Sequence, residues 1–237
     1  MPKQPVKPNY VQQMDAVMAQ LAEQRPRLLL HACCGPCSSS VLEVLEQHFD
    51  ITILYYNPNT WPPEEYERRG EELAKFLEKS GREQSVALAW GHYDPQEFYA
   101  IAAGHEADPE RGDRCTRCYR LRLEETARYA AEHGFDWFCT TLSLSPHKDA
   151  VRINQIGEEM AKKYQVRHLP NEFKKRDGYR RSLALSDEYG LYRQDYCGCE
   201  FSAKAAQAHR AIKAAEEAAS ADGPALAADP QGSAQNH

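Results

Sequence analysis

The residues with the most chemistry in this sequence are its cysteines, of which the 237-residue chain has eight. Seven lie in three tight groups, Cys33/Cys34/Cys37, Cys115/Cys118 and Cys197/Cys199, and Cys139 stands alone. A disulfide framework is the simplest alternative, but a chain of this length does not need such crosslinks, and its N-terminus shows no apolar segment of a secretory signal. The grouping therefore predicts metal binding or redox chemistry.

The first group lies in HACCGPC, where a predicted strand gives way to a helix. Ligands of open parallel sheets bind beyond the carboxyl ends of the strands, so this is where a site would be built. Adjacent strand residues point to opposite faces, so Cys33 and Cys34 can share a metal only if the chain turns, which Gly35 and Pro36 permit. The N-terminus of the following helix would favour thiolates.

Cys115 and Cys118 are three residues apart at the start of a predicted helix, so both can point to one side. Together with Cys33 and Cys34 they supply four thiolates. Such a set holds either zinc or an iron–sulfur cluster, and the number of thiolates does not distinguish the two. The adjacent Cys33–Cys34 pair is unlike the usual spacing of zinc ligands, which favours the cluster.

Cys197 and Cys199 flank a single glycine. A disulfide across one residue would be strained and easily reduced, which favours a redox-active pair over a structural crosslink. A second pair of metal ligands is the alternative. Cys139 lies in an apolar strand and is predicted to belong to the core.

The elements that must position these cysteines alternate between strands and helices. Strands are predicted at 27–31, 51–56, 86–90 and 136–141. One helix is predicted at 10–24 and a second directly after the turn at 33–40. Further helices are predicted at 63–80, 95–103, 115–133, 149–164 and 201–219. This alternation predicts an α/β fold with an open, Rossmann-like parallel sheet covered by helices on both faces. Residues 1–219 are predicted to form a single domain ending in a C-terminal helix, and 220–237 a disordered tail.

Composition is that of an ordinary soluble globular protein, with 42% hydrophobic and 27% charged residues. Its apolar runs are far shorter than the ~18 residues that span a bilayer, so we expect a cytoplasmic protein with no membrane partner. The net charge is −6, but the body contains two basic stretches, 111–122 and 174–181. Each could be a solvated surface or a nucleic-acid contact.

Five segments resemble the QueH-type epoxyqueuosine reductases, and they occur in that family's order between residues 28 and 202. They are LLLHACCGPCS, YYNPNTWPPEEYERR, DRCTRCYRLRLEETA, TTLSLSPHKD and FKKRDGYRRSLALSDEYGLYRQDYCGCEFS. The resemblance implies reduction of epoxyqueuosine to queuosine in the tRNA anticodon loop, the last step of queuosine biosynthesis. It also implies a [4Fe-4S] cluster without flavin or cobalamin, and a fold related to the ATP-pyrophosphatases.

Carried over by position, the resemblance assigns the cluster to Cys33, Cys34, Cys115 and Cys118 and the redox-active disulfide pair to Cys197 and Cys199. Cys37 is a candidate ligand for an additional mononuclear iron. The electron donor is not identified by the sequence. No glycine-rich phosphate loop is present, so nucleotide binding is not predicted.

The basic segment 174–181 is the predicted tRNA contact, because its charges suit phosphates and its tyrosine suits a splayed base. The residues assigned to it are Lys174, Lys175, Arg176, Tyr179, Arg180 and Arg181. Two alternative functions stay open at this point. One is a zinc-stabilised tRNA-binding module without catalysis, and the other is a metal-independent thiol oxidoreductase that uses CGPC and CGC but leaves Cys115 and Cys118 unexplained.

Overall fold

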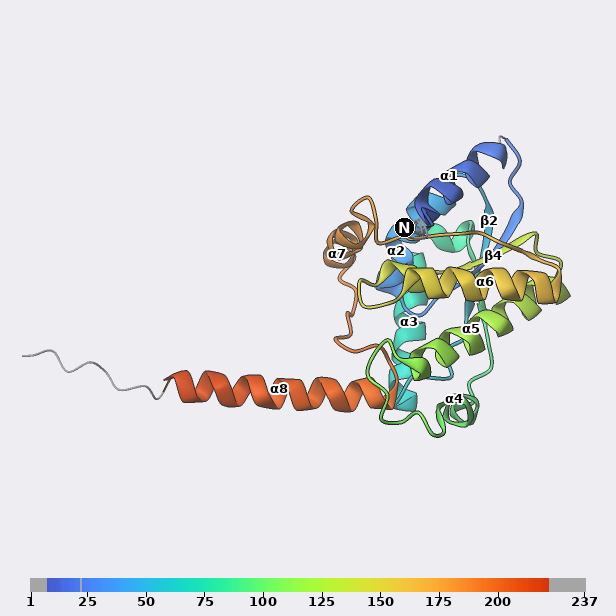
Figure 1. Cartoon of the computed structure of the whole chain (residues 1–237). Coiled ribbons are helices and arrows are strands. Elements are labelled where there is room, and N and C mark those ends of the chain that lie inside the picture. The colour runs from blue at the N-terminus through green and yellow to red at the C-terminus, as the bar shows by residue number, and fades with distance from the viewer. Residues whose placement is uncertain (1–7, 22, 222–237) are drawn as a thin grey trace, which may run out of the picture.

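The computed structural model describes residues 8–21 and 23–221. At its centre is a five-stranded parallel sheet in the order β3–β2–β1–β4–β5 (Figure 1). The strands are β1 (Arg27–His31), β2 (Asp50–Tyr55), β3 (Ala87–Trp90), β4 (Trp137–Thr140) and β5 (Arg167–His168). The α-helices are α1 (Tyr10–Leu21), α2 (Gly35–Leu45), α3 (Pro63–Lys79), α4 (Pro95–Ala102), α5 (Asp113–Glu132), α6 (Ala150–Tyr164), α7 (Gly178–Glu188) and α8 (Glu200–Ala221).

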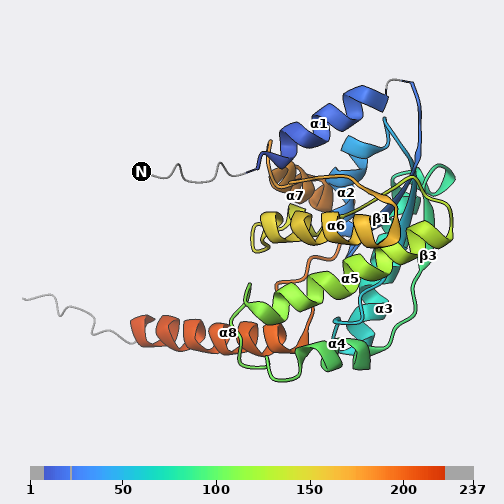
Figure 2. The same ribbon diagram turned by 45° about the vertical axis from the view of Figure 1, so that its right-hand side comes forward.

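The sheet is buried on both faces, which explains why its central strand β1 is apolar from Leu28 to Leu30. Side chains alternate along β1, so Leu28 and Leu30 pack with α1, α2 and α3 in one hydrophobic cluster. Leu29 faces the other way and packs with α5 and α6. Figure 2 shows α5 and α6 lying side by side as one layer. The predicted α/β fold, a parallel sheet with helices on both faces, is confirmed.

The strand order determines where a ligand-binding site can form. The chain passes from β1 to β2 on one side, and β4 pairs with β1 on the other, so connections from the two sides diverge at the carboxyl end of β1. His31 joins the strand ends there, with Nδ1 2.8 Å from Thr140 Oγ1 and Nε2 3.0 Å from the Tyr56 carbonyl oxygen. Cys33 lies two residues further along the chain.

Predicted and observed elements agree closely where the sequence has a strong apolar pattern, and the strand at 27–31 matches β1 throughout. β5 and α7 were not predicted from the sequence. β5 has only two residues, too few for a periodic pattern, and α7 begins directly after two residues with positive φ, Arg176 and Asp177. α8 leaves the body as a straight projecting helix (Figures 1 and 2).

The predicted tail at 220–237 falls mostly on residues 222–237, which lie outside the described residues; α8 ends at Ala221. Within the described part of the chain, every helix is too short or too polar to cross a membrane.

A buried histidine makes stability depend on pH. Both ring nitrogens of His168 lack hydrogen-bond partners in the described part of the chain, and burial lowers the pKa of His168 to about 3. Below pH 6.5, the ordinary pKa of histidine, the unfolded chain takes up a proton that the folded chain does not. The free energy of unfolding therefore decreases as the pH is lowered from about 6.5 to about 3. At pH 5 this single group should lower the free energy of unfolding by about 2 kcal/mol.

We predict that the His168→Leu variant loses less stability than the parent protein between pH 7.5 and pH 5, by that amount, in urea unfolding. His31 is present in both proteins and its contribution cancels. An equal loss in the two proteins would contradict the prediction.

Candidate metal and redox centre

Three thiols gather where β1 ends and α2 begins. The sulfur atoms of Cys33, Cys34 and Cys37 all lie within 4.8 Å of one another, and Cys33 Sγ is 3.8 Å from Cys34 Sγ. Cys34 is extended and immediately precedes α2, which has Pro36 in its first turn. The turn predicted from Gly35 and Pro36 therefore brings the adjacent cysteines together.

The pKa of each of the three thiols depends on the other two. Hydrogen bonds from Cys34 and Cys37 hold the pKa of the Cys33 thiol well below its usual value, and the positive charges of Lys148 and Arg122 act in the same direction. The hydrogen bond to Cys33 raises the pKa of Cys34 to about 11, and the pKa of Cys37 is also raised. A metal that binds the trio must displace the protons of Cys34 and Cys37.

A second group of cysteines comes from two distant segments. Cys115 and Cys118 from the first turns of α5 line one small pocket together with Cys197 and Cys199, which precede α8. Burial raises the pKa of Cys118 to about 12, and it also raises the pKa of Cys199. Burial disfavours the charged thiolate, so these thiols need a metal or a nearby cation, such as Arg122 in the wall of the same pocket, to ionise.

Cys197 joins the two groups. It also lines a larger pocket of about 690 Å³, whose wall includes Cys33 and Cys37. The three cysteine groups found in the sequence thus surround one region of the fold. The predicted cluster ligands form two neighbouring groups, and Cys33, Cys34 and Cys37 are the only described trio of potential ligands within 4.8 Å. A four-iron cluster does not require closer approach, because each thiolate binds a different iron.

The CGC segment is held by the loop after β2. Trp61 N donates to the Gly198 carbonyl oxygen at 2.8 Å, and Arg69 Nη1 donates to that of Cys197 at 3.3 Å. Gly198 has φ 126°, which favours glycine, and a Cβ there would lie 2.8 Å from Arg69 Nη1. All eight cysteines are unpaired in the structure, so the predicted disulfide between Cys197 and Cys199 is not formed.

The sequence analysis missed the cations that surround these thiols. Arg122 is 1% exposed and lines the small pocket, and Lys148 is 8% exposed and lines the large one. Arg122 follows Cys118 by four residues on α5, and this helical spacing could have predicted that both face the same side. The interpretation of 111–122 as a solvated surface is wrong for Arg114 and Arg122, which are buried.

The basic segment 174–181 is largely neutralised by carboxylates. Four of its side chains make ion pairs, namely Lys174 with Glu172, Arg176 with Asp15, Arg180 with Asp177 and Arg181 with Glu43. Lys175 is exposed and has no ion pair among the described residues. Tyr179 lines the large pocket, so one end of the predicted tRNA contact reaches the cysteine site.

The donor set fits a soft metal or a cluster. It consists of sulfur, which suits zinc or iron–sulfur sites and not magnesium or calcium. One guanidinium nitrogen of Arg122, Nη2, is buried without a partner, and such an atom suits a neighbouring anion. Fold and site together define a cysteine-rich α/β protein with the means to bind metal through thiolates.

Comparison with known proteins identifies the family. The family model described as Epoxyqueuosine reductase QueH matches residues 28–205. A relative of the same name from Streptococcus pyogenes serotype M1 is 42% identical over 207 residues, covering 83% of this chain and 80% of that protein. Another from Haemophilus influenzae is 40% identical over 185 residues, covering 77% and 74%. The chain belongs to the epoxyqueuosine reductase QueH family.

A solved structure, the U34-tRNA thiolase NcsA from Methanococcus maripaludis with its [4Fe-4S] cluster, is 13% identical and gives a TM-score of 0.44. The match covers 87% of this chain and 74% of that one. The family assignment rests on the sequence relatives.

Metal binding should depend on the clustered cysteines and not on the isolated one. We expect Cys34→Ala and Cys118→Ala to lose most of the metal that the parent protein binds, measured by elemental analysis after anaerobic purification. Cys139→Ala is the matched control, because Cys139 is fully buried among apolar side chains of the core. Full metal content in both site variants, or equal loss in the control, would contradict the assignment.

Proposed function

We propose that this chain is an epoxyqueuosine reductase, which removes the epoxide oxygen of epoxyqueuosine in the tRNA anticodon loop and leaves queuosine. The observation that carries the proposal is the family match over residues 28–205, which contains all seven grouped cysteines. The structure supports it by bringing cysteines of all three groups to two pockets that share Cys197.

We propose a [4Fe-4S] cluster held by Cys33, Cys34, Cys115 and Cys118, with Cys37 as a ligand to an additional mononuclear iron. When bound, such a cluster supplies electrons one at a time. Zinc has no redox chemistry, so the zinc-stabilised RNA-binding module is not favoured for a reductase. The thiol oxidoreductase without metal is not favoured either, because Cys115 and Cys118 would have no role in it.

Converting the epoxide to an alkene takes two electrons and two protons and releases the oxygen as water. Oxidation of the dithiol formed by Cys197 and Cys199 to a disulfide supplies two of each, so the two half-reactions balance. The position of Cys197 supports this role, because the residue lies both beside Cys115 and Cys118 and on the wall of the large pocket. An external electron donor would then restore the dithiol.

The large pocket is the proposed site for the modified base. Its volume of about 690 Å³ suits a nucleobase with a substituent, and Tyr179 and Tyr196 in its wall offer rings for stacking. Arg193 and Gln194 add hydrogen-bond donors for recognition. Because this substrate is part of tRNA, we place the enzyme in the cytoplasm.

We propose that the tRNA backbone contacts the rim formed by Lys174, Lys175, Arg176, Tyr179, Arg180 and Arg181. Among these, the unpaired Lys175 is the strongest candidate for a phosphate contact, since the other cations would have to exchange a carboxylate for a phosphate.

The first test of the proposed function is conversion of epoxyqueuosine in tRNA, followed by nucleoside analysis. The anaerobically purified protein should contain roughly four iron and four sulfide for the cluster, plus any additional iron. Cys199→Ser should keep iron and sulfide near the parent level, keep tRNA binding, and lose multiple turnovers. Loss of iron in this variant would make Cys199 a metal ligand, and unchanged turnover would remove the pair from the reaction.

The second test addresses the RNA surface. Lys175→Gln should weaken tRNA binding and reduce the dependence of log K on log salt by about 0.7 to 0.9 units, as expected for one lost phosphate contact. The joint neutralisation of Lys174, Lys175 and Arg176 should weaken binding further, because it also frees Glu172 and Asp15. Lys162→Gln, an exposed site near the end of α6, serves as the control. Binding that is equally strong in all variants would place the RNA contact elsewhere.

A further inference from the structure

Two buried cations beside the cysteines have no carboxylate partner among the residues that the structure describes. Arg122 lines the small pocket with Cys115, Cys118, Cys197 and Cys199, and its hydrogen bonds are long ones, 3.4 Å to the Cys118 carbonyl oxygen and 3.5 Å to Asn57 Oδ1. The Lys148 ammonium donates no hydrogen bond to any described residue and makes no ion pair with one. Leaving a buried charge uncompensated is costly, so both cations require a neighbouring anion.

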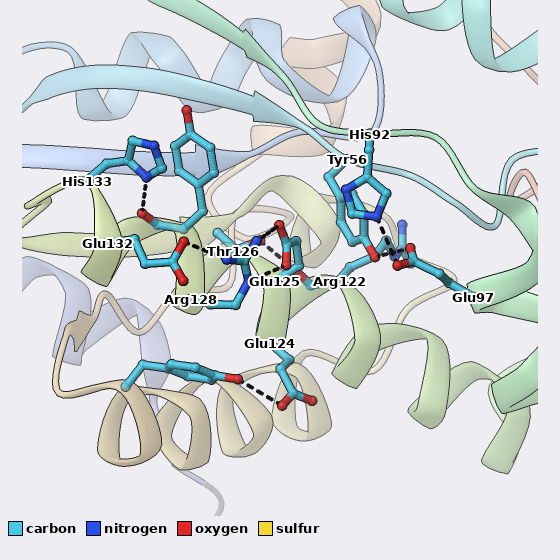
Figure 3. Close-up of polar contacts among 12 residues, drawn as sticks. Tyr56, His92, Glu97, Arg122, Glu124, Glu125, Thr126, Arg128, Glu132 and His133 are labelled. Carbon is cyan, nitrogen blue, oxygen red and sulfur yellow. Dashed lines mark hydrogen bonds and ion pairs between the residues drawn. The ribbon is translucent and has the colours of Figure 1, made fainter.

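The nearby carboxylates are already engaged. Glu97 accepts the Tyr56 hydroxyl at 2.7 Å and contacts His92 Nε2 at 2.9 Å, as Figure 3 shows. Glu125, three residues beyond Arg122 on α5, pairs with Arg128 at 2.6 Å. Arg69 offers a contrast, because this other buried arginine has its own carboxylate in Glu65, 2.7 Å away. Carboxylates therefore balance Arg69 but neither Arg122 nor Lys148.

Thiols are the acidic groups that face both cations. Arg122 interacts electrostatically with Cys33, Cys118 and Cys197, and Lys148 with Cys33, Cys37 and Cys197. A [4Fe-4S] centre with four thiolates carries two negative charges when oxidised and three when reduced by one electron. The two cations match the oxidised charge and attract the reduced form more strongly, since the energy of a charge pair grows with the charge.

We propose that Arg122 and Lys148 are the counter-charges of the cysteine-bound centre and raise its reduction potential. This inference rests on the iron–sulfur centre of the proposed function. Both side chains act through the centre and are positioning residues, in the sense that they set its electrostatic surroundings without taking part in bond formation. Charge near a cluster and donors to its sulfurs are known to shift such potentials.

The test is a redox titration of the anaerobically purified full-length protein with dithionite, followed by electron paramagnetic resonance. Arg122→Gln and Lys148→Met each remove one charge, so each should make reduction at least tenfold less favourable, a midpoint about 59 mV more negative for a one-electron couple. Arg122→Lys and Lys148→Arg keep the charge and should restore the potential. Arg128→Gln, on the same helix but 41% exposed, should leave it unchanged.

Iron and sulfide content is measured in parallel. If Arg122→Gln loses the centre while Arg122→Lys keeps it, the charge is needed to hold the anion, which supports the proposal. Equal loss in both arginine variants would make Arg122 a packing residue, and full occupancy with unchanged potential in both neutral variants would overturn the proposal. Failure of the proposed function is recognised separately, because the parent protein would then give no reducible iron signal.

Discussion

The structure depends on one constraint, which is that thiols from three distant segments must meet at the carboxyl end of the central strand. The central strand β1 satisfies it because β2 and β4 flank it and end at the same level. His31 holds these ends together through Thr140 and the carbonyl group of Tyr56. Cys33 follows, 3.7 Å from Thr141 Oγ1 after β4, so the first cysteine group lies where connections from both sides of the sheet diverge.

Burial then makes the thiols and the cations depend on each other. A thiol removed from water resists ionisation, as the pKa of about 12 for Cys118 shows, and a buried guanidinium without an anion is equally unfavourable. Because Arg122 and the thiols are neighbours, Arg122 lowers the pKa of Cys118 and the thiols stabilise the cation. A metal centre bound by these thiols would complete this balance, because binding displaces their protons and leaves thiolates beside the cations.

The sequence was sufficient to predict the fold class and most elements, because β1 and its helices carry strong apolar patterns. The cysteine groups could also be found, since their spacing is visible in the sequence itself. Helical spacing places Arg122 on the same side of α5 as Cys118, but the burial of Arg122 and Lys148 could not be predicted in this way. A charged residue in the polar sequence RCTRCYRLRLEE is expected on the surface, and only the packing of α5 against the CGC segment makes it buried. In the same way, two of the four ion pairs that neutralise 174–181 join it to α1 and α2, far away in the sequence.

The loop after β2 shows what such long-range packing achieves. Its sequence, NPNTWPP, contains no residue with obvious redox or metal chemistry, and yet it forms part of the family resemblance. In the structure its backbone forms two hydrogen bonds with the CGC region. The Tyr196 hydroxyl donates to the Trp61 carbonyl oxygen, and Trp61 N donates to the Gly198 carbonyl oxygen. Because Cys197 borders both pockets, fixing this short segment fixes the position of the dithiol between the proposed metal ligands and the proposed substrate site. The loop is therefore best understood as a positioning element, and its sequence is constrained by the geometry of the cysteines it holds.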